Sequence, residues 1–312
     1  MKHSYTASLI ALSMGCLSAC GGSDGTPVIE PPLIVTTTTP PPPPPQTTIN
    51  EQVMVTAIFE SNTNHLGWEY IIENSQTGFN AAIERAKSNN LKPEFIDVKR
   101  FGDEYTYTLI TTTNYDGVSW SIRINETASQ YEASLSEMKS KNYRPEAIDV
   151  DYVNYASRYS SIWVSNDDNR NWQLALNQDQ QGYENFIDYS KFNNQTPTIL
   201  DIDIVNNKQT FSGISETIHS GWQLNTWMSL DDFNLNVEEQ KALGRHPVYI
   251  DVDMSGQELR FSTIWLDNIN GLGWYVIPYS DIDEFNSTVT QLKAQNYRPV
   301  LIKTCRPSQC SQ

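Results

Sequence analysis

One short string in this chain has the residue types of a nucleophilic catalyst: Ser136-Glu137-Met138-Lys139. A serine three residues before a lysine can attack an acyl group when the amine accepts its proton. No Ser-Asp-Asn or Lys-Thr-Gly string follows to complete such a site. The lysine belongs to a recurring position, whereas the residue three before it varies between copies. The recurring lysines are Lys87, Lys139, Lys191, Lys241 and Lys293. We therefore expect a lysine that serves the fold, and no enzyme activity.

Aspartates recur after these lysines, and in three copies they form Asp-x-Asp pairs. The pairs are Asp149 and Asp151, Asp201 and Asp203, and Asp251 and Asp253. At the first position of the pair, the first copy has Asp97 and the fifth copy has Lys303. Alternation along a strand places both carboxylates of a pair on one face. Either that face packs on a helix, where the aspartate pairs with the recurring lysine or with the arginine before a proline, or it is a solvated acidic face. Calcium prefers clustered oxygen ligands, but no twelve-residue calcium loop occurs. We expect no metal and no cofactor, and the pairs leave calcium binding open.

Tryptophan and proline recur in fixed phase along the chain. The tryptophans are Trp68, Trp120, Trp172, Trp222 and Trp274, and the prolines are Pro93, Pro145, Pro197, Pro247 and Pro299. Two residue types in constant phase indicate one structural unit of about 52 residues, copied five times. We expect these ten residues to form the repeated core.

The same four elements are predicted in each copy. Aromatic and β-branched residues alternate in Tyr159–Trp163 and Phe261–Trp265, which indicates a strand. A polar loop leads to a second strand that begins at the recurring tryptophan, and we expect the two strands to form a hairpin. An aromatic residue then opens an amphipathic helix, such as 131–140, which should end before the proline. A third strand, such as 148–150, follows.

A unit of this size cannot bury its apolar face alone, so five neighbours should form one domain over residues 52–305. The fold class is therefore an α+β repeat protein of five strand-strand-helix-strand units. Neither end of the array has a clearly polar capping repeat. We accordingly favour a propeller-like ring over an open solenoid.

Residues 1–19 have the composition of a secretory signal peptide, with Lys2 near the start and an apolar run from Ala7 to Met14. The ending Leu17-Ser18-Ala19-Cys20 resembles the bacterial lipobox, which implies that Cys20 becomes the N-terminus and carries acyl chains such as palmitate. An ordinary signal peptide that contains a cysteine is the alternative. Gly21 after the cysteine indicates the outer membrane, by the sorting pattern of enteric lipoproteins, on either its periplasmic or its surface face.

The segments on either side of the repeat domain differ from it in composition. Residues 20–50 are rich in Thr, Pro, Gly and Ser, which predicts an extended stalk. In the tail, residues 305–312, an exported compartment favours a disulfide between Cys305 and Cys310.

The formal net charge of -16 excludes one class of partner. Such a field repels nucleic acid and anionic lipid headgroups. We expect no nucleic-acid partner, membrane contact only through the lipid anchor, and a monomeric protein.

The repeated motifs resemble the bacterial tandem repeat module, which also forms the N-terminal region of polyglycine hydrolases. The matching residues are Tyr143-Arg144-Pro145, Tyr297-Arg298-Pro299, Tyr159–Trp163 and Phe261–Trp265. Repeats two, three and five match well, whereas repeat four departs with Ser215 and Arg245-His246. The resemblance covers nearly everything after the stalk and implies a repeat scaffold. In polyglycine hydrolases the chemistry resides in a separate domain that resembles β-lactamases, and we expect no such domain in this chain.

Polar loops that differ in every copy precede the recurring tryptophans, at residues 61–67, 112–119, 165–171, 216–221 and 267–273. Because the units repeat, all five should lie on one side and form a recognition surface. Polar turns without a binding role are the alternative. The candidate rim residues are Asn64, Asp116, Asp168, His219 and Asn270. His65 and His219 fall in equivalent loops, but with no second histidine at ligand spacing we expect solvated side chains.

These inferences predict a lipid-anchored envelope scaffold that acts by binding a surface glycan, a peptide or another envelope protein. One alternative is a serine-hydrolase-like enzyme, or an accessory subunit of one. The other is a purely structural spacer.

Overall fold

The computed structural model describes residues 53–101, 104–153, 155–206, 208–218, 220–255 and 258–305. The signal peptide, Cys20, the stalk, His219 and Cys310 lie outside these ranges, so the predictions that concern them stay predictions. The chain divides into two units, Met1–Pro43 and Pro44–Gln312, and all the described residues belong to the second. Within the described ranges, no helix is long and apolar enough to cross a membrane.

The described residues form helices and strands in a constant order. The helices are α1 (Gln76–Ser88), α2 (Ala128–Ser140), α3 (Gln180–Phe192), α4 (Leu230–Ala242) and α5 (Ile282–Ala294). The strands are β1 (Met54–Ser61), β2 (Trp68–Glu73), β3 (Leu91–Phe101), β4 (Glu104–Thr113), β5 (Trp120–Glu126), β6 (Tyr143–Val153), β7 (Ala156–Ser165), β8 (Trp172–Gln178), β9 (Thr196–Val205), β10 (Lys208–Glu216), β11 (Trp222–Met228), β12 (Arg245–Ser255), β13 (Glu258–Asp267), β14 (Trp274–Asp281) and β15 (Tyr297–Cys305). Strand, strand, helix and strand therefore alternate as the sequence predicts.

The strands pair in five antiparallel sheets of three. Their orders are β2-β4-β3, β5-β7-β6, β8-β10-β9, β11-β13-β12 and β14-β1-β15. The predicted hairpin between the first strand of a copy and its tryptophan strand is wrong: β7 pairs with β5 and β6, and β8 belongs to the next sheet. The tight hairpin instead joins the third strand to the strand after it, as where Val153 pairs with Ala156. Both connections are short and polar, so their sequences did not distinguish them.

The fifth sheet is completed by the first strand of the domain. β1 lies between β14 and β15 and pairs with both, from Met54 opposite Asp281 and Cys305 to Glu60 opposite Trp274 and Arg298. In every other sheet the equivalent middle strand comes from the chain directly after the third strand. Residues from both ends of the domain therefore build one sheet.

Local signals place each helix. A Ser, Thr or Asp side chain accepts a hydrogen bond from the backbone at every helix start: Ser75, Thr127, Asp179, Ser229 and Asp281. Just after every helix end, a residue with positive φ stops the helix: Asn90, Asn142, Asn194, Gly244 and Asn296. All five helices end before the recurring proline, as predicted.

Each recurring proline lies inside the third strand of its sheet. The strand register shifts next to Pro93, Pro145, Pro197, Pro247 and Pro299. A β-bulge tolerates proline because the bulged residue need not donate to the ladder. Each recurring proline therefore lies at a β-bulge of the third strand and also follows the end of a helix.

The core forms between helix and sheet. Phe79, Tyr131, Tyr183, Phe233 and Phe285 lie on the helices and are all buried. Four of them stack on an aromatic residue of the middle strand, with ring centroids 4.4 Å apart for Tyr183 and Phe211 and 4.6 Å apart for Phe233 and Phe261. Aromatic pairs of this kind stabilise the fold beyond the area they bury. In each case the packing joins a helix to the strand on which it lies.

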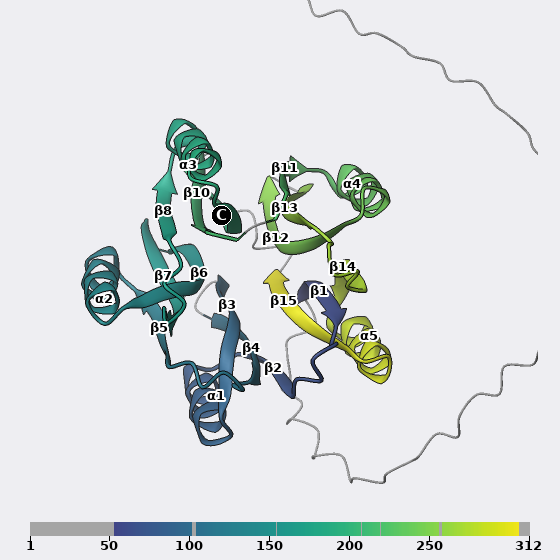
Figure 1. Ribbon diagram of the computed structural model, residues 1–312, viewed down its shortest axis with the longest axis horizontal. Coiled ribbons are helices and arrows are strands. Elements are labelled where there is room, and N and C mark those ends of the chain that lie inside the picture. Colours follow the sequence, from purple (N-terminus) through teal and green to yellow (C-terminus); the bar gives the residue numbers. More distant parts are fainter. Residues whose placement is uncertain are drawn as a thin grey trace, which may run out of the picture. The chain divides into compact units, whose positions relative to one another are not determined.

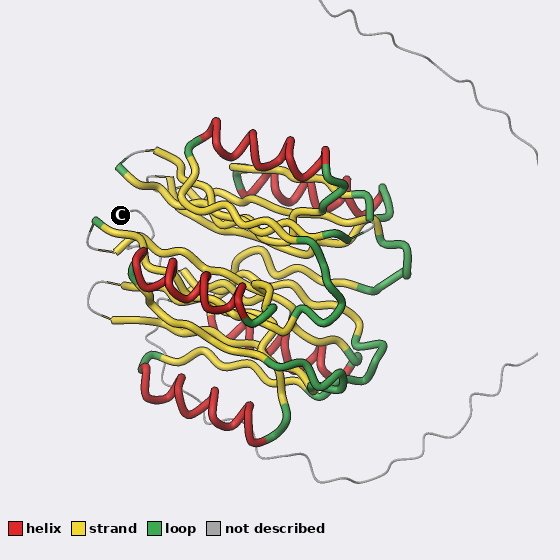
Figure 2. Tube along the Cα trace, turned by 60° about the vertical axis from the view of Figure 1, so that its left-hand side comes forward, coloured by secondary structure: helices red, strands yellow, loops and turns green. Residues whose placement is uncertain are grey.

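Within the repeat unit, the five sheets surround a common centre and the helices lie outermost (Figure 1). The third strand of each sheet contacts that of the next, and β15 of the last sheet contacts β3 of the first. The connections between sheets gather at one end of the unit (Figure 2). Long-range contacts therefore run through all five sheets without a break.

A buried ion cluster occupies the centre. Lys303 Nζ lies 3.7 Å from Asp97 Oδ1, 3.7 Å from Asp149 Oδ1, 3.0 Å from Asp201 Oδ1 and 3.1 Å from Asp251 Oδ1. The Oδ2 atom of each aspartate accepts a backbone N–H from the preceding sheet, donated by Thr304, Val98, Val150 and Ile202 in the same order. One ammonium group thus holds residues from all the other four sheets.

Both environments that the sequence suggested for these aspartates are wrong. All four are at most 3% exposed, so they do not form a solvated face. They pair with Lys303, which stands at the equivalent strand position of the fifth copy. The helix lysines have other partners: Lys87 contacts Glu84, and Lys293 lies over the Trp68 ring. The reason is topological, because the third strands face the centre of the unit and the helices lie on the other side.

We predict that Lys303→Met destabilises the protein by about 3–5 kcal/mol, because it leaves four buried carboxylates without their cation. Urea unfolding followed by tryptophan fluorescence measures this change. Lys303→Asp, which restores the residue of the other copies, should be at least as damaging. The control Lys87→Met removes an exposed pair with Glu84 and should cost less than about 1 kcal/mol. A loss of less than about 1 kcal/mol for Lys303→Met would contradict the central role of this lysine.

Candidate functional site

A hollow in the described part of the chain lies along β8, the outer strand of the third sheet. It has a volume of about 790 Å³, in the range typical of ligand sites. Its lining consists of Leu135, Lys139, Trp172, Gln173, Leu174, Ala175, Leu176, Gln178, Gly182, Asn185, Phe186 and Tyr189. We call this hollow the β8 groove. It is built from α2 of the second sheet and from β8 and α3 of the third.

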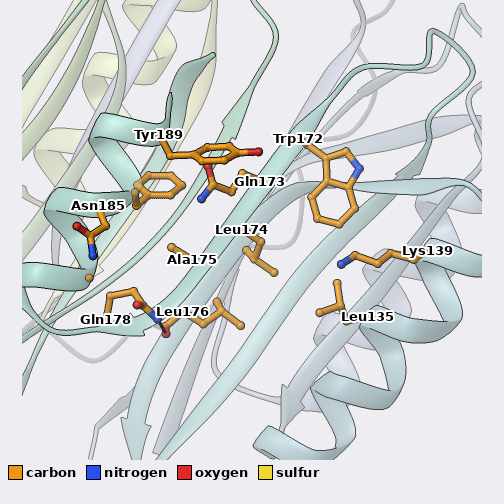
Figure 3. Close-up of a pocket in the computed structure, with 12 residues that line it drawn as sticks. Leu135, Lys139, Trp172, Gln173, Leu174, Ala175, Leu176, Gln178, Asn185 and Tyr189 are labelled. Carbon is orange, nitrogen blue, oxygen red and sulfur yellow. Dashed lines mark hydrogen bonds between the residues drawn. The ribbon is translucent and has the colours of Figure 1, made fainter. Parts of the chain in front are cut away.

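Strand alternation gives the β8 groove two sides. Trp172 and Leu174 lie toward α2 with Leu135 and Lys139, whereas Gln173 lies toward α3 (Figure 3). Among the described strands, β8 pairs only with β10, so its outer edge carries no further strand. The floor of the groove is therefore a strand edge, and its walls are two helices.

Lys139 closes the α2 side of the groove. Its Nζ lies 5.1 Å from the centroid of the Trp172 ring, a cation–π contact between consecutive sheets. Ser136, the candidate nucleophile, is exposed, and its Oγ donates to the backbone carbonyl of Glu132 at 3.0 Å. Lys139 therefore contacts the next sheet, as Lys293 does, whereas Lys87 and Lys191 pair with carboxylates of their own helices.

The equivalent positions in the first two sheets are filled by ion pairs. In the first sheet Arg85 Nε lies 3.2 Å from Glu69 Oε2. In the second sheet Arg123 Nη2 lies 3.3 Å from Glu137 Oε2. The third sheet has Tyr189 where the others have Arg85 and Glu137, and Ala175 where the second has Arg123. The third copy has therefore lost the charges and the bulk that cover this surface elsewhere.

Leu174 adds to the space. In the first sheet the equivalent residue is Tyr70, whose hydroxyl donates to Asn286 Oδ1 at 3.1 Å and whose ring packs edge-on against Phe285. The shorter Leu174 makes no such bridge to the helix of the preceding sheet. Leu174 therefore leaves space on this side of the groove that Tyr70 fills in the first sheet.

A smaller cavity of about 350 Å³ adjoins the β8 groove. It shares Trp172 and Tyr189 with the groove and is otherwise lined by Arg170, Asn171, Asn193, Gln195 and Thr217. Arg170 contacts Asp168 and Glu216, and Glu216 also accepts from Arg144 at 2.9 Å. Together the linings of the two cavities reach from α3 to the loop before β8.

The loops that were predicted to form a recognition rim connect successive sheets. Asn64, Asp116, Asp168 and Asn270 are exposed in them, as a rim requires. Four of the loops share one conformation, in which an asparagine side chain accepts from the backbone four residues on: Asn62, Asn114, Asn166 and Asn268. Their backbones therefore vary less than their sequences, and the loop before β8 lines the smaller cavity through Arg170.

The recurring tryptophans hold equivalent places. Each opens an outer strand and is half-buried. Trp163 and Trp265, on the middle strands, are instead fully buried. Trp163 packs edge-on against Trp172, and Trp265 packs edge-on against Trp274. The recurring tryptophans thus mark the contacts between neighbouring sheets.

A second candidate site is an acidic layer next to the central cluster. Lys99, Asp151, Asp203 and Asp253 are half-buried two residues beyond the central column. Burial, with the charge of Asp251, raises the pKa of Asp253 to about 7. Burial and the charge of Asp201 likewise raise the pKa of Asp203. No three His, Cys, Asp or Glu residues in the described part of the chain are arranged to hold a metal ion.

Sequence reasoning missed Tyr189, Gln173 and Ala175. A signal was present, because the position of Tyr189 carries Arg85, Glu137, Glu239 and Gln291 in the other copies. A single aromatic residue in a polar helix column marks the copy that differs. Comparison of the copies does not show which residues of β8 lie near Tyr189, because that depends on how α3 crosses β8.

The family comparison identifies the repeat. The family model of the polyglycine hydrolase-like structural repeat matches residues 117–166, 219–268 and 271–308. The chain therefore contains tandem copies of this repeat, as the resemblance predicted. No curated protein matches the chain in sequence.

The matched ranges agree with the sheets of the structure. Residues 117–166 span β5, α2, β6 and β7, and residues 219–268 span β11, α4, β12 and β13. The match at 271–308 is shorter because the middle strand of that sheet, β1, comes from the other end of the domain. Ser215 lies outside the matched ranges, in agreement with the expectation that its copy departs, whereas Arg245, His246 and Pro247 lie within the match at 219–268.

We predict that Asp253→Asn makes stability less dependent on pH. The ordinary pKa of 3.8 rises to about 7 in the folded protein, so the folded state keeps a proton that the unfolded state releases. Stability should therefore fall as the pH rises from about 4 to about 7, and the asparagine variant should exceed the wild type in Tm above that range. Thermal unfolding between about pH 4 and pH 8 tests this. Asp116→Asn, in an exposed loop, is the control, and parallel pH profiles for Asp253→Asn and the wild type would refute the prediction.

Proposed function

We propose that this tandem array of polyglycine hydrolase-like structural repeats is a binding scaffold of the bacterial envelope, with the β8 groove as its ligand site. The single observation that carries the proposal is the difference between the third copy and the first two. Where those two copies have an ion pair across the helix and outer strand, the third has a hollow lined by Tyr189, Ala175 and Gln173. A feature that differs between copies of a repeated scaffold is not required by the scaffold itself.

We also propose that the five sheets form a propeller-like ring. In support, Arg298 of β15 contacts Glu94 of β3 at 2.6 Å, and Lys293 of α5 lies over Trp68 of β2. Equivalent contacts join the second sheet to the third, through Arg144 with Glu216 and Lys139 with Trp172. Contacts between the first and last copies are those that an open solenoid would lack.

The proposed location rests on the N-terminal sequence. The string ending in Cys20 supports a lipid anchor, and residues 20–50 support a stalk that holds the repeat unit away from the membrane. The net charge of -16 would keep the unit off anionic headgroups and nucleic acid. The outer membrane, on its periplasmic or surface face, is the location we propose.

The binding proposal is tested by transplanting the ion pair of the second sheet into the third. Ala175→Arg with Tyr189→Glu copies Arg123 and Glu137 and should fill the β8 groove without unfolding the protein. The full-length protein is applied to an array of oligosaccharides and extended peptides, and we expect the double variant to lose at least about tenfold in affinity.

The matched control exchanges the charges of a pair outside the groove. Glu69→Arg with Arg85→Glu preserves the pair of the first sheet and should bind like the wild type. If the wild type binds no probe, or the groove variant binds as well as the control, the β8 groove is not a ligand site. Either result would favour a purely structural spacer.

The enzyme alternative makes a different prediction about Ser136. Its hydroxyl donates to the Glu132 carbonyl and Lys139 lies over Trp172, so neither group is positioned toward the other's chemistry. We expect a fluorophosphonate probe to leave the full-length protein unlabelled and Ser136→Ala to bind ligands like the wild type. Labelling that disappears in Ser136→Ala would favour the hydrolase.

A further inference from the structure

We infer that the ligand of the β8 groove is a neutral oligosaccharide chain. This inference rests on the proposed binding function and adds the chemical class of the ligand. It is carried by three features of the lining, which are a buried acceptor without a partner, exposed aromatic surface beside amides, and the absence of carboxylates.

The first feature is the side chain of Gln173. Its Oε1 atom is buried and has no hydrogen-bond partner. Gln173 lines the groove on the side of Tyr189 (Figure 3). A buried acceptor without a donor costs about 1–3 kcal/mol. Because Oε1 has almost no surface open to solvent, a ligand hydroxyl would reach it and remove that cost only after the side chain turns toward the groove.

The second feature is the pairing of aromatic rings with amides. Tyr189 is 51% exposed although it lies between both cavities, and Trp172 is half-buried between the same two. Sugar rings present C–H groups on their faces and hydroxyls on their rims. Aromatic planes accept the faces, and amides serve the rims because they donate and accept at once. The amides of the lining are Gln173, Gln178, Asn185, Asn171, Asn193 and Gln195.

The third feature is charge. Of the described residues that line the two cavities, none is Asp or Glu, although the chain as a whole carries -16. The two cations of the lining are already engaged, Lys139 with Trp172 and Arg170 with Asp168 and Glu216. No charge in this lining is left to select an acidic ligand, so it suits an uncharged one.

The size of the site favours a chain over a single sugar. The cavities of about 790 Å³ and about 350 Å³ meet at Trp172 and Tyr189. Consecutive residues Trp172 to Leu176 line the larger one, so this cavity follows β8. A ligand that uses both cavities must be extended and must pass the two aromatic rings.

The experiment measures binding of the full-length protein to an array of defined probes. The probes are neutral hexasaccharides of glucose, mannose and N-acetylglucosamine, acidic hexagalacturonate, and an extended glycine-serine decapeptide. We expect at least one neutral hexasaccharide to bind. Tyr189→Ala should weaken binding by about tenfold through lost stacking, and Tyr189→Phe by less than about threefold because the ring remains.

Gln173→Leu tests the unpaired acceptor. It keeps a side chain of similar bulk but removes the amide that would bind a ligand hydroxyl, so we expect at least about a tenfold loss. The control Tyr275→Ala removes a tyrosine of similar exposure, 47%, from the outer strand of the fifth sheet and should have no effect. Thermal unfolding confirms that each variant is folded.

The outcomes separate this inference from the binding proposal. Suppose that only the decapeptide or hexagalacturonate binds, and that the double variant Ala175→Arg with Tyr189→Glu loses this binding. That result would refute the neutral oligosaccharide and keep the binding function. Binding of neutral hexasaccharides that Tyr189→Ala and Gln173→Leu leave unchanged would refute the site. If no probe binds, both proposals fall.

Discussion

The ammonium group of Lys303 is shared among Asp97, Asp149, Asp201 and Asp251, and this cluster joins the sheets at the centre. Burial alone would lower the pKa of Lys303, but the surrounding carboxylates, led by Asp201, raise it well above its usual range. Burial raises the pKa of Asp149 and Asp251, whereas Lys303 and Lys99 outweigh the burial of Asp201 and lower its pKa. A fifth aspartate would add a buried negative charge and remove the cation that all four reach. Strict repetition is therefore incompatible with this centre, and the fifth copy must differ.

The sequence predicted the elements well because their signals are local. The N-cap at Thr127, the positive-φ stop at Asn142 and the aromatic Tyr131 act within one helix, so their order could be recognised without a structure. Strand pairing could not, because β7 and the strands on either side of it are all apolar enough to pair with one another. The predicted surroundings of Asp149 depended on the predicted strand pairing, so they were wrong for the same reason. Lys303 was visible as an exception in its column, yet its meaning required knowing that all five third strands face one centre.

The candidate site illustrates how a repeat scaffold can acquire a specific surface. Positions that hold the sheets together are filled in equivalent ways, such as Lys139 over Trp172 and Lys293 over Trp68. Positions on the outer face between helix and strand are free to change, and the exchange of an ion pair for Tyr189 and Ala175 opens a hollow without touching the core. The sequence pointed to the loops as the variable surface. Four of the loops share an asparagine-anchored backbone, and the outer strand edge along β8 is a second place where the copies differ.

The position of β1 has a consequence for biosynthesis. This strand leaves the ribosome before any other part of the repeat domain, but both its partners, β14 and β15, are the last to be made. Until they arrive, an apolar strand with two unsatisfied edges must be kept from pairing with other chains. A nascent chain cut short before β15 would leave at least one edge of β1 unpaired. The fold therefore depends on synthesis through β15, because only then can both edges of β1 be covered.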